Sequence, residues 1–551
     1  MDARDHATAR PRVPLALVLA VLLSVPWFFP ALRGEFLTWD DDRNFLTNPD
    51  YRGLGWAQIR WMFSTFHLGH YQPLTWLTLG LDHALWGMAP LGYHVTNLAL
   101  HGANVTLLFF LLRVILRRAR PGAEAVLIDW AAAAGAVLFG AHPLRVESVV
   151  WVTERRQLLS TALLLTAVLC HLSRRSFAAV TVHALAALAA AWAVVLPPVL
   201  LVLDRYLARS APAHRGRYAL SMAPYVAVAA TGVAVNVLAS HAVGAGRPLS
   251  EHTLAPRIAQ ACFGLGYYLW NTLLPIHLAP LYELPPRLDP LASRYVASAV
   301  GVVIVTVALY LGRRRRPGPW TAWLCYGIVL LPALGLFQVG PHLVADRYSY
   351  LASMPIAALA AALLLGFTRR APWISAAVLA LMLGPLATRY SLFFCDSVSL
   401  WSRAVAMDAH SYVARTNLGH ALEIAGRTDE AIDQYRRSLQ IRPGERKTRY
   451  KLGLAYARTH RYDLALAQWR PLVAEQPRMA ELHFSIGLAS FRLGRHADAA
   501  DAYRRAIGIE PGYVEAHRAL SEALRALGRA EEAGSALDAA RSVTRPYRPP
   551  Y

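Results

Sequence analysis

The pattern of apolar and polar positions divides the chain into two parts. Up to about residue 395, apolar stretches of roughly 17 to 25 residues alternate with short polar segments, several of which carry clustered arginines. A stretch of this length is enough for a helix that crosses a bilayer, so residues 1–395 are predicted to form a polytopic helical membrane domain of about 11 spans. The rest of the chain is polar and rich in alanine and arginine, which is not typical of spanning helices.

The arginine clusters predict an orientation for this domain. Because cytoplasmic loops are enriched in Lys and Arg, we assign Arg117-Arg118, Arg174-Arg175 and Arg313–Arg316 to the cytoplasm, together with the N-terminus. Three segments are then expected on the outer face: residues 33–92, residues 142–157 and the residues around Asp346. The part of the chain after the last span is also placed outside the cytoplasm.

Between residues 176 and 290 the chain has four apolar stretches, where the flanking arginines require an odd number of crossings. One stretch is therefore expected to be half-length or re-entrant. Residues 194–206 are the candidate, because Pro197-Pro198 lack the backbone donors that a continuous helix needs.

The polar part repeats with a period of 34 residues from about residue 409. Two sets of positions fall in register: Gly419, Gly453, Gly487 and Ser521, and Tyr435, Trp469, Tyr503 and Leu537. This is the length of a tetratricopeptide unit, a pair of helices that stacks on its neighbours into a solenoid. Counting back 34 residues from Tyr435 reaches Trp401, so residues 397–408 are predicted to form the helix of a half unit.

The expected fold class is therefore all-α, with a membrane helix bundle followed by a helical solenoid. The predicted limits are residues 1–395 for the membrane domain, 396–545 for a half unit plus four repeats, and 546–551 for a Pro-rich tail. The concave face of such a solenoid suits an extended peptide, but the same array on any membrane protein could be an assembly scaffold.

Composition supports this organisation and excludes some functions. Hydrophobic residues make up 55% of the 551 positions, charged residues 17%, and the mean hydropathy is +0.31, unlike a soluble globular protein. The formal net charge of +21 does not indicate nucleic-acid binding, because the arginines gather at helix ends, where membrane lipid is their expected partner. Three of the four cysteines fall in apolar segments, which argues against a disulfide framework.

A run of acids, Asp40-Asp41-Asp42, follows Trp39 directly after the first predicted span. Carboxylates at a bilayer edge are costly to desolvate and contribute nothing to insertion, so the run is a candidate functional site. The structural alternative is a solvated loop after a helix.

The second outer segment carries Arg145, Arg155 and Arg156 on the side that membrane proteins keep poor in basic residues. Such a cluster needs an anionic partner. A phospholipid headgroup or the phosphate of a lipid carrier would match the guanidinium fork. The structural alternative pairs Arg155 with Glu147 or Glu154 across helix turns.

The third outer segment adds Arg347, between Asp346 and Tyr348. Carboxylates beside arginines at one depth suit transfer from a lipid phosphate. The arginines would stabilise the phosphate leaving group, and a carboxylate would take the proton from an attacking hydroxyl.

Metal binding is a further alternative for the first outer segment. His67 and His70 could face one side of a helix, but no partner Cys or HExxH arrangement accompanies them, so no metal ligand is assigned. The aspartate run could hold a divalent cation through its oxygens, and this ion stays open as a cofactor.

Several short motifs occur in a fixed order along the chain. They are Trp39-Asp40-Asp41, Tyr71–Trp76, Gly92–Asn97, His142–Trp151, Glu154-Arg155 and Ala345–Tyr350, followed by the repeats. This order resembles the transmembrane and tetratricopeptide repeat-containing O-mannosyltransferases and their bacterial relatives, over nearly the whole chain. The His-Pro-x-x-x-Glu loop at His142 and the Ala-Asp-Arg-Tyr segment at Ala345 are its most specific parts.

The resemblance implies a GT-C membrane glycosyltransferase, which passes a sugar with inversion from a polyprenyl phosphate to a Ser or Thr hydroxyl of a protein. Asp40 and Asp41 match the family's paired acids, one of them the catalytic base, and Asp42 is an additional acid assigned to substrate binding. Glu147 and His142 match the second motif, and Arg347 matches the candidate for the carrier phosphate.

The sequence therefore predicts Asp40, Asp41 and Glu147 as catalytic residues. The predicted substrate-binding residues are Asp42, His142, Arg145, Arg155, Arg347 and Tyr348. The expected location is a bacterial inner membrane, with extracytoplasmic repeats that dock the acceptor protein. The competing hypothesis is a non-enzymatic membrane anchor that presents a repeat scaffold to envelope proteins.

Overall fold

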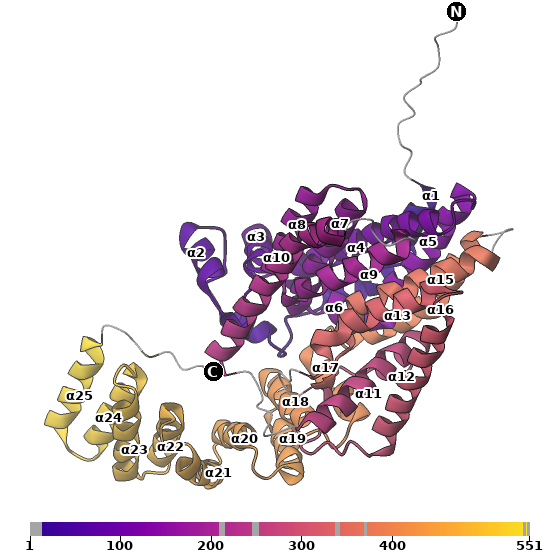
Figure 1. The fold of residues 1–551 in the computed structure, drawn as a ribbon. Coiled ribbons are helices and arrows are strands. Elements are labelled where there is room, and N and C mark those ends of the chain that lie inside the picture. Colours follow the sequence, from indigo (N-terminus) through magenta and orange to yellow (C-terminus); the bar gives the residue numbers. More distant parts are fainter. Residues whose placement is uncertain are drawn as a thin grey trace, which may run out of the picture. The chain divides into compact units, whose positions relative to one another are not determined.

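A computed structural model describes residues 14–208, 215–244, 253–336, 342–367, 372–543 and residue 547. The chain forms two compact units, Met1–Leu400 and Trp401–Tyr551 (Figure 1). Of the predicted Pro-rich tail, only Tyr547 lies inside the described residues. The first thirteen residues, which include the N-terminal arginines, lie outside them.

The first unit is built from helices, with two short strands in its described part. The α-helices up to the second outer segment are α1 (Leu15–Leu22), α2 (Trp56–Ser64), α3 (Pro73–Trp86), α4 (Pro90–Ala119), α5 (Ala125–Gly140), α6 (Val146–Val150) and α7 (Arg155–Leu172). The later ones are α8 (Ser176–Ala189), α9 (Leu196–Ala208), α10 (Arg215–Ala242), α11 (Leu254–Leu273), α12 (Ser293–Gly312), α13 (Pro317–Leu330), α14 (Ser349–Ala352), α15 (Met354–Phe367), α16 (Pro372–Leu392) and α17 (Ser397–Met407).

Shorter elements connect these helices. Strands β1 (Tyr282–Glu283) and β2 (His342–Val344) pair antiparallel. The 3-10 and π turns are η1 (Val25–Arg33), η2 (Asp42–Leu46), η3 (His67–Gly69), η4 (Pro143–Arg145), η5 (Val152–Glu154), η6 (Ala191–Val195), η7 (Leu331–Ala333) and η8 (Asp346–Tyr348).

Five helices of the described residues are long and apolar enough to cross a membrane, or up to seven if each of two bent helix pairs forms one span. The five are Leu15–Arg33, Pro90–Ala119, Tyr218–Ala242, Ser293–Gly312 and Trp373–Leu392. This is the make-up of an integral membrane protein. The number of about 11 spans stays a prediction.

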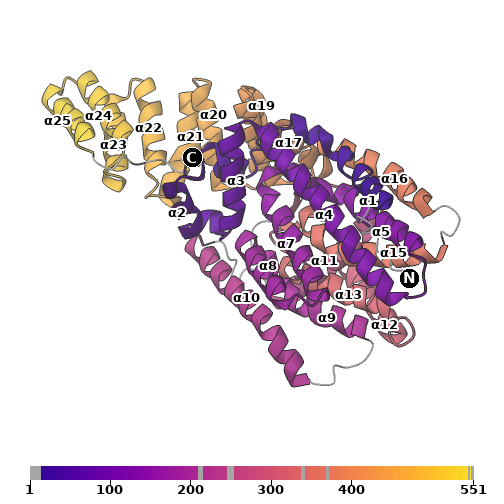
Figure 2. The ribbon, with the colours of Figure 1, turned by 90° about the horizontal axis from the view of Figure 1, so that it is seen from above.

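Helix α5 lies among α1, α4, α15 and α16 and packs on all four (Figure 2). Its alanines and glycines allow this close approach. A Cβ on Gly135 would lie 2.8 Å from a Leu112 methyl and 2.9 Å from the carbonyl oxygen of Ala357, and one on Gly140 would lie 2.6 Å from Ser24 Oγ. Contacts this short do not occur, so both positions require glycine.

The two prolines that predicted a broken span begin a helix. Pro197 and Pro198 lie in the first turn of α9, where a missing N–H costs no intrahelical hydrogen bond. The helix has 13 residues, about 20 Å at 1.5 Å per residue, which is less than a bilayer core. The half-length or re-entrant crossing at this place stays a prediction.

The second unit contains the predicted array, four helix pairs that follow one another in chain order (Figure 1). Its helices are α18 (Tyr412–Ile424), α19 (Thr428–Ile441), α20 (Arg446–Arg458), α21 (Tyr462–Glu475), α22 (Ala480–Arg492), α23 (His496–Ile509), α24 (Val514–Ala526) and α25 (Ala530–Ser542). The predicted half-unit helix at residues 397–408 corresponds to α17.

Each pair is held together at the registered positions found in the sequence. A Cβ on Gly419, Gly453 or Gly487 would lie 2.6, 2.2 or 2.5 Å from the aromatic ring one helix later, that of Tyr435, Trp469 or Tyr503. In the fourth pair Ser521 replaces the glycine and donates to the carbonyl of Ala533 at 2.7 Å. The smaller Leu537 stands there in place of the ring.

Candidate functional site

The three predicted outer segments meet around the side chain of Arg347. The rings of Trp39 and Trp151, from the first and second segments, stack with centroids 4.4 Å apart and planes 16° from parallel. The Arg347 guanidinium, from the third segment, lies 5.7 Å from the Trp39 ring and 5.5 Å from the Trp151 ring. Segments about 110 and 200 residues apart in sequence thus share one aromatic and cationic cluster.

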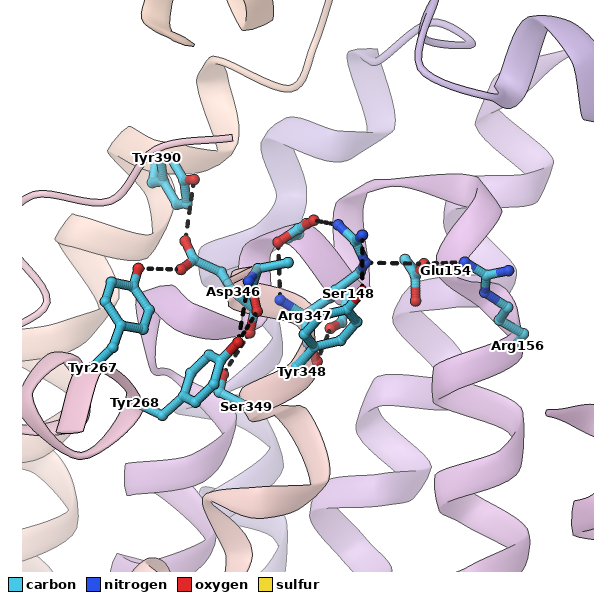
Figure 3. Close-up of polar contacts among 12 residues, drawn as sticks. Ser148, Glu154, Arg156, Tyr267, Tyr268, Asp346, Arg347, Tyr348, Ser349 and Tyr390 are labelled. Carbon is cyan, nitrogen blue, oxygen red and sulfur yellow. Dashed lines mark hydrogen bonds and ion pairs between the residues drawn. The ribbon is translucent and has the colours of Figure 1, made fainter. Parts of the chain in front are cut away.

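Arg347 is the centre of an alternating row of charges. Its backbone N–H donates to Glu147 Oε2 at 2.9 Å and its guanidinium hydrogen-bonds to Glu147 Oε1. On the other side, Arg347 Nε lies 3.6 Å from Glu154 Oε1, which also accepts from Arg156 at 2.8 Å (Figure 3). Each buried charge has an opposite neighbour, which low-dielectric surroundings require.

Glu147 is fully buried and both of its oxygens face Arg347. We therefore assign Glu147 a positioning role, in place of the direct catalytic role that the sequence predicts. Tyr348 completes the cluster: its ring lies 4.9 Å from the Arg347 guanidinium and 5.9 Å from the ring of Trp192.

The carboxylates of Asp40 and Asp41 lie in different surroundings. Asp41 is fully buried, and its oxygens accept from Leu37 N at 3.0 Å, Thr153 N at 3.0 Å and Thr153 Oγ1 at 2.6 Å. Burial raises the pKa of Asp41 to about 8, against the effect of these three hydrogen bonds. Asp41 thus joins the first outer segment to the second, and both of its oxygens accept hydrogen bonds from the protein.

Asp40 is half-buried, and its carboxylate has no hydrogen bond or ion pair with any described residue. Its backbone has φ of +67°, the left-handed region that costs a residue with a Cβ roughly 1 kcal/mol or more. The fold holds this strained residue between Trp39 of the aromatic cluster and the buried Asp41. Asp40 is the acid of the run best placed to act on another molecule.

Asp42 begins the π turn η2 and is half-buried. Burial raises the pKa of its carboxyl, and the Oδ1 atom has no hydrogen-bond partner in the described part of the chain. Its predicted contact with substrate remains a prediction.

Three other predicted substrate-binding residues are turned into the protein. Arg155 is fully buried and donates to Asp82 at 2.7 Å, Asn97 at 2.5 Å and the carbonyl of Tyr93 at 2.8 Å. The alternative that pairs Arg155 with Glu147 or Glu154 is therefore wrong, because Asp82 takes that place. We assign Arg155 the structural role of tying α7 to α3 and α4.

Arg145 and His142 hold the second segment in place. Arg145 donates to Ser349 O at 2.9 Å and Ser349 Oγ at 2.8 Å, which fixes the turn that carries Arg347. His142 Nδ1 accepts from Leu144 N at 3.2 Å, and Nε2 lies 3.1 Å from the carbonyl of Thr272. Both side chains are buried, so we assign them structural roles as well.

Asp346 is a buried acid that the sequence-based site did not include. It accepts from Tyr267 at 2.7 Å and Tyr390 at 3.3 Å, two hydroxyls from helices α11 and α16 (Figure 3). Tyr268 brackets the preceding residue, since its hydroxyl donates to the Ala345 carbonyl at 3.2 Å and accepts from the Ala345 N–H at 3.1 Å. These contacts fix the backbone that aims Arg347.

His70 also belongs to this site. Burial and the positive charges of Arg156 and Arg347 lower the pKa of its imidazole to about 3. His342 is similar, because burial and Arg347 lower its pKa to about 3. Among the residues that the structure describes, no group of three or more His, Cys, Asp or Glu side chains is arranged to hold a metal ion.

These pKa values predict the pH dependence of stability. The unfolded chain takes up protons on His70 and His342 near pH 6.5 and the folded chain only near pH 3, so acid favours unfolding throughout this window. Asp41 acts in the opposite direction, because its stabilising contribution is complete below its ordinary pKa of 3.8 and is lost as pH rises from there to about 8. The two histidines outweigh Asp41 below pH 6.5, and only Asp41 acts between pH 6.5 and 8, so thermal unfolding in detergent should show the highest stability near pH 6.5.

Replacing His70 and His342 with Gln should flatten the acid side of this profile. The matched control is His277→Gln, at an exposed histidine, which should leave the slope unchanged. An equal slope in all variants would contradict the assignment.

Comparisons with known proteins agree with this architecture. Tetratricopeptide repeat models match residues 393–446, 450–514 and 490–549. "Protein O-mannosyl-transferase F38B6.6" of Caenorhabditis elegans is 22% identical over 449 residues, which cover 78% of this chain and 63% of that protein. The chain is thus similar to proteins named protein O-mannosyl-transferases.

Shorter stretches match two further relatives. TMTC2 of Mus musculus is 30% identical over 30% of this chain and 20% of its own length, and Tmtc1 of Drosophila melanogaster is 35% identical over 22% and 13%. The chain thus spans less than two thirds of the length of these relatives. A solved structure of MamA (AMB-1) matches 26% of the chain with 29% identity and a TM-score of 0.25.

Proposed function

We propose that this protein is a GT-C-type glycosyltransferase that moves mannose or a similar hexose from a polyprenyl phosphate to a Ser or Thr hydroxyl of a protein. The observation that carries the proposal is the buried, oriented guanidinium of Arg347, which packs on the ring of Trp39. The next residue, Asp40, has a carboxylate without a partner among the described residues. The names of the relatives support sugar transfer to protein.

In the proposed reaction, the acceptor hydroxyl oxygen attacks the anomeric carbon of the sugar. The bond from that carbon to the phosphate oxygen breaks, and the lipid phosphate leaves with the electron pair. Arg347 stabilises the charge on the leaving phosphate, as a preorganised guanidinium does. The Asp40 carboxylate takes the proton of the hydroxyl.

An apolar cavity next to this cluster supports a lipid donor. Its volume is about 170 Å³, and it lies among helices α4, α7, α9, α13 and α15. Val195 and Leu351 are among its lining residues, and they lie three residues along the chain from Trp192 and Tyr348, whose rings are in contact beside Arg347. An isoprenoid chain could lie in this cavity with its phosphate at Arg347.

We also propose a location for this reaction. We place the protein in a bacterial inner membrane, with the catalytic cluster and the repeats on the outer side, where the repeats dock the acceptor protein. The test is a reconstituted reaction with a radiolabelled polyprenyl-phosphate hexose and an acceptor protein, followed by mass spectrometry of glycopeptides. Absence of any glycopeptide difference between cells with and without the gene would reject the proposal.

If the lipid chain of the donor binds in this cavity, filling the cavity should weaken donor binding. Ala358 on α15 lines it, and Ala358→Phe should fill part of the space that the lipid chain needs. We expect the KM for a long-chain polyprenyl donor to rise about tenfold, with kcat and the KM for a two-isoprene donor little changed. The matched control is Ala227→Phe, at an exposed alanine of α10. An unchanged KM for the long-chain donor would place the lipid elsewhere.

A further inference from the structure

Tyr547, a residue beyond the last repeat helix, is bound on the surface of the third and fourth repeats. Its hydroxyl donates to Glu481 Oε1 of α22 at 2.5 Å, and its backbone N–H donates to the carbonyl of Gly512 at 2.7 Å. Its ring lies 5.2 Å from that of Tyr513. Extended peptides are commonly bound in this way, through hydrogen bonds of the backbone together with contacts of a side chain.

The surface against which Tyr547 packs is apolar. Ala480, Ala506, Tyr513 and Ala516 are buried there in one cluster, and Phe484, Ile509 and Tyr547 pack against it. The phenol ring thus fills an apolar site whose far end carries a single carboxylate. Such a site fits an aromatic ring with a hydroxyl better than a wholly apolar side chain.

Glu481 distinguishes this repeat from the others. The positions 34 residues before and after it are Lys447 and Glu515, and both are exposed, whereas Glu481 is only 8% exposed. The repeat fold therefore does not require a buried acid here. Tyr547 is the described residue that donates to this carboxylate, and a buried carboxylate without a donor would be costly.

The charges around the site favour a basic ligand. Burial raises the pKa of the Tyr547 and Tyr513 hydroxyls. The negative charges of Glu481 and Glu510 raise it further at Tyr547, and those of Glu481 and Glu515 do so at Tyr513. In sequence, Tyr547 lies between Arg545-Pro546 and Arg548-Pro549. Arginines next to the tyrosine are complementary to an acidic surface of this kind.

We propose that the face of α22 and α24 around Glu481 is a binding site for an extended peptide in which a tyrosine is flanked by basic residues. Tyr547 occupies this site within the same chain. A protein segment of the same chemistry would compete with it. This inference does not depend on the proposed sugar transfer.

The test uses the chain in detergent, full-length or cut after Val543, and a fluorescein-labelled peptide with the sequence of residues 543–551. We expect saturable binding to the cut chain by fluorescence anisotropy, and at least tenfold weaker binding to the full-length chain. The reason is that a tethered competitor has an effective concentration of about a millimolar. No binding to the cut chain, or equal binding to both, would overturn the proposal.

Two matched pairs of variants assign the contacts. A peptide with Tyr547→Phe should bind about tenfold more weakly to the cut chain, because it lacks the donor to Glu481, whereas Tyr551→Phe should bind normally. In the cut chain, Glu481→Ala should weaken binding and Asp498→Asn, at an exposed acid of α23, should not. Circular dichroism of each protein variant confirms that the helices are retained. Equal effects within either pair would contradict the assigned contacts.

Discussion

Replacing Asp40 with Asn is expected to lower sugar transfer roughly 10²- to 10⁴-fold, the usual contribution of a general base. The substitution removes the proton acceptor and changes little else. Asn tolerates the left-handed backbone that Asp40 adopts, and the Asp40 carboxylate has no partner among the described residues to lose. Transfer is measured with a labelled polyprenyl-phosphate hexose, at equal levels of protein in the membrane.

The neighbouring acids serve as controls for this prediction. Asp41→Asn should lower the amount of folded protein, because an amide NH2 would face the donor of Leu37 or of Thr153 whichever way it turns. Asp42→Asn tests the third acid of the run. Retained transfer in Asp40→Asn, with loss in Asp41→Asn at normal protein levels, would move the base to Asp41.

The same variant separates an enzyme from a scaffold. A non-enzymatic anchor for the repeats would not be affected by Asp40→Asn, since this residue lies in the first unit and not in the array. The repeat unit tethered to an unrelated span would then restore the phenotype of a deletion strain. If the protein is a transferase, neither of these results is expected.

The repeat array could be predicted almost completely from the sequence, and the reason is local. The first three units repeat one contact, between a glycine and the ring that follows 16 residues later, as in Gly419 and Tyr435. The interacting residues are close in sequence and recur at a fixed spacing. A pattern of this kind shows both the element and its packing.

The site could be predicted only in part. The motifs indicated correctly which segments meet, but not the partner of each side chain. Arg155 and Arg347 both lie in arginine motifs next to acids, yet Arg155 pairs with Asp82, 73 residues away, and Arg347 with Glu147, 200 residues away. Partners at such distances depend on how helices pack, which spacing along the chain does not determine.

The difference between Asp40 and Asp41 could not be predicted from the sequence for the same reason. Two adjacent identical residues have different surroundings here because Thr153, 112 residues away, binds only one of them. The role of Asp346 was also missed, since its two tyrosine partners come from α11 and α16. Tyrosines at the ends of two distant apolar segments were the available signal.

The second large effect is expected at the ion pair between Arg347 and Glu147. Arg347→Met should lower the stability of the protein by about 3 to 5 kcal/mol, because it leaves the fully buried Glu147 without its cation. Glu147→Gln should be milder, since Arg347 keeps Glu154 3.6 Å away. Thermal unfolding in detergent measures both effects.

The double variant, Arg347→Met with Glu147→Gln, separates stability from transfer. Removing both charges should restore most of the stability, as neutral replacement of a buried ion pair does. Sugar transfer should remain lower by roughly 10²- to 10³-fold, because no guanidinium stabilises the leaving phosphate. If the double variant regained both stability and transfer, Arg347 would have only a structural role, and the phosphate would have to bind to another cation of the cluster, of which Arg156 is the nearest partner of Glu154.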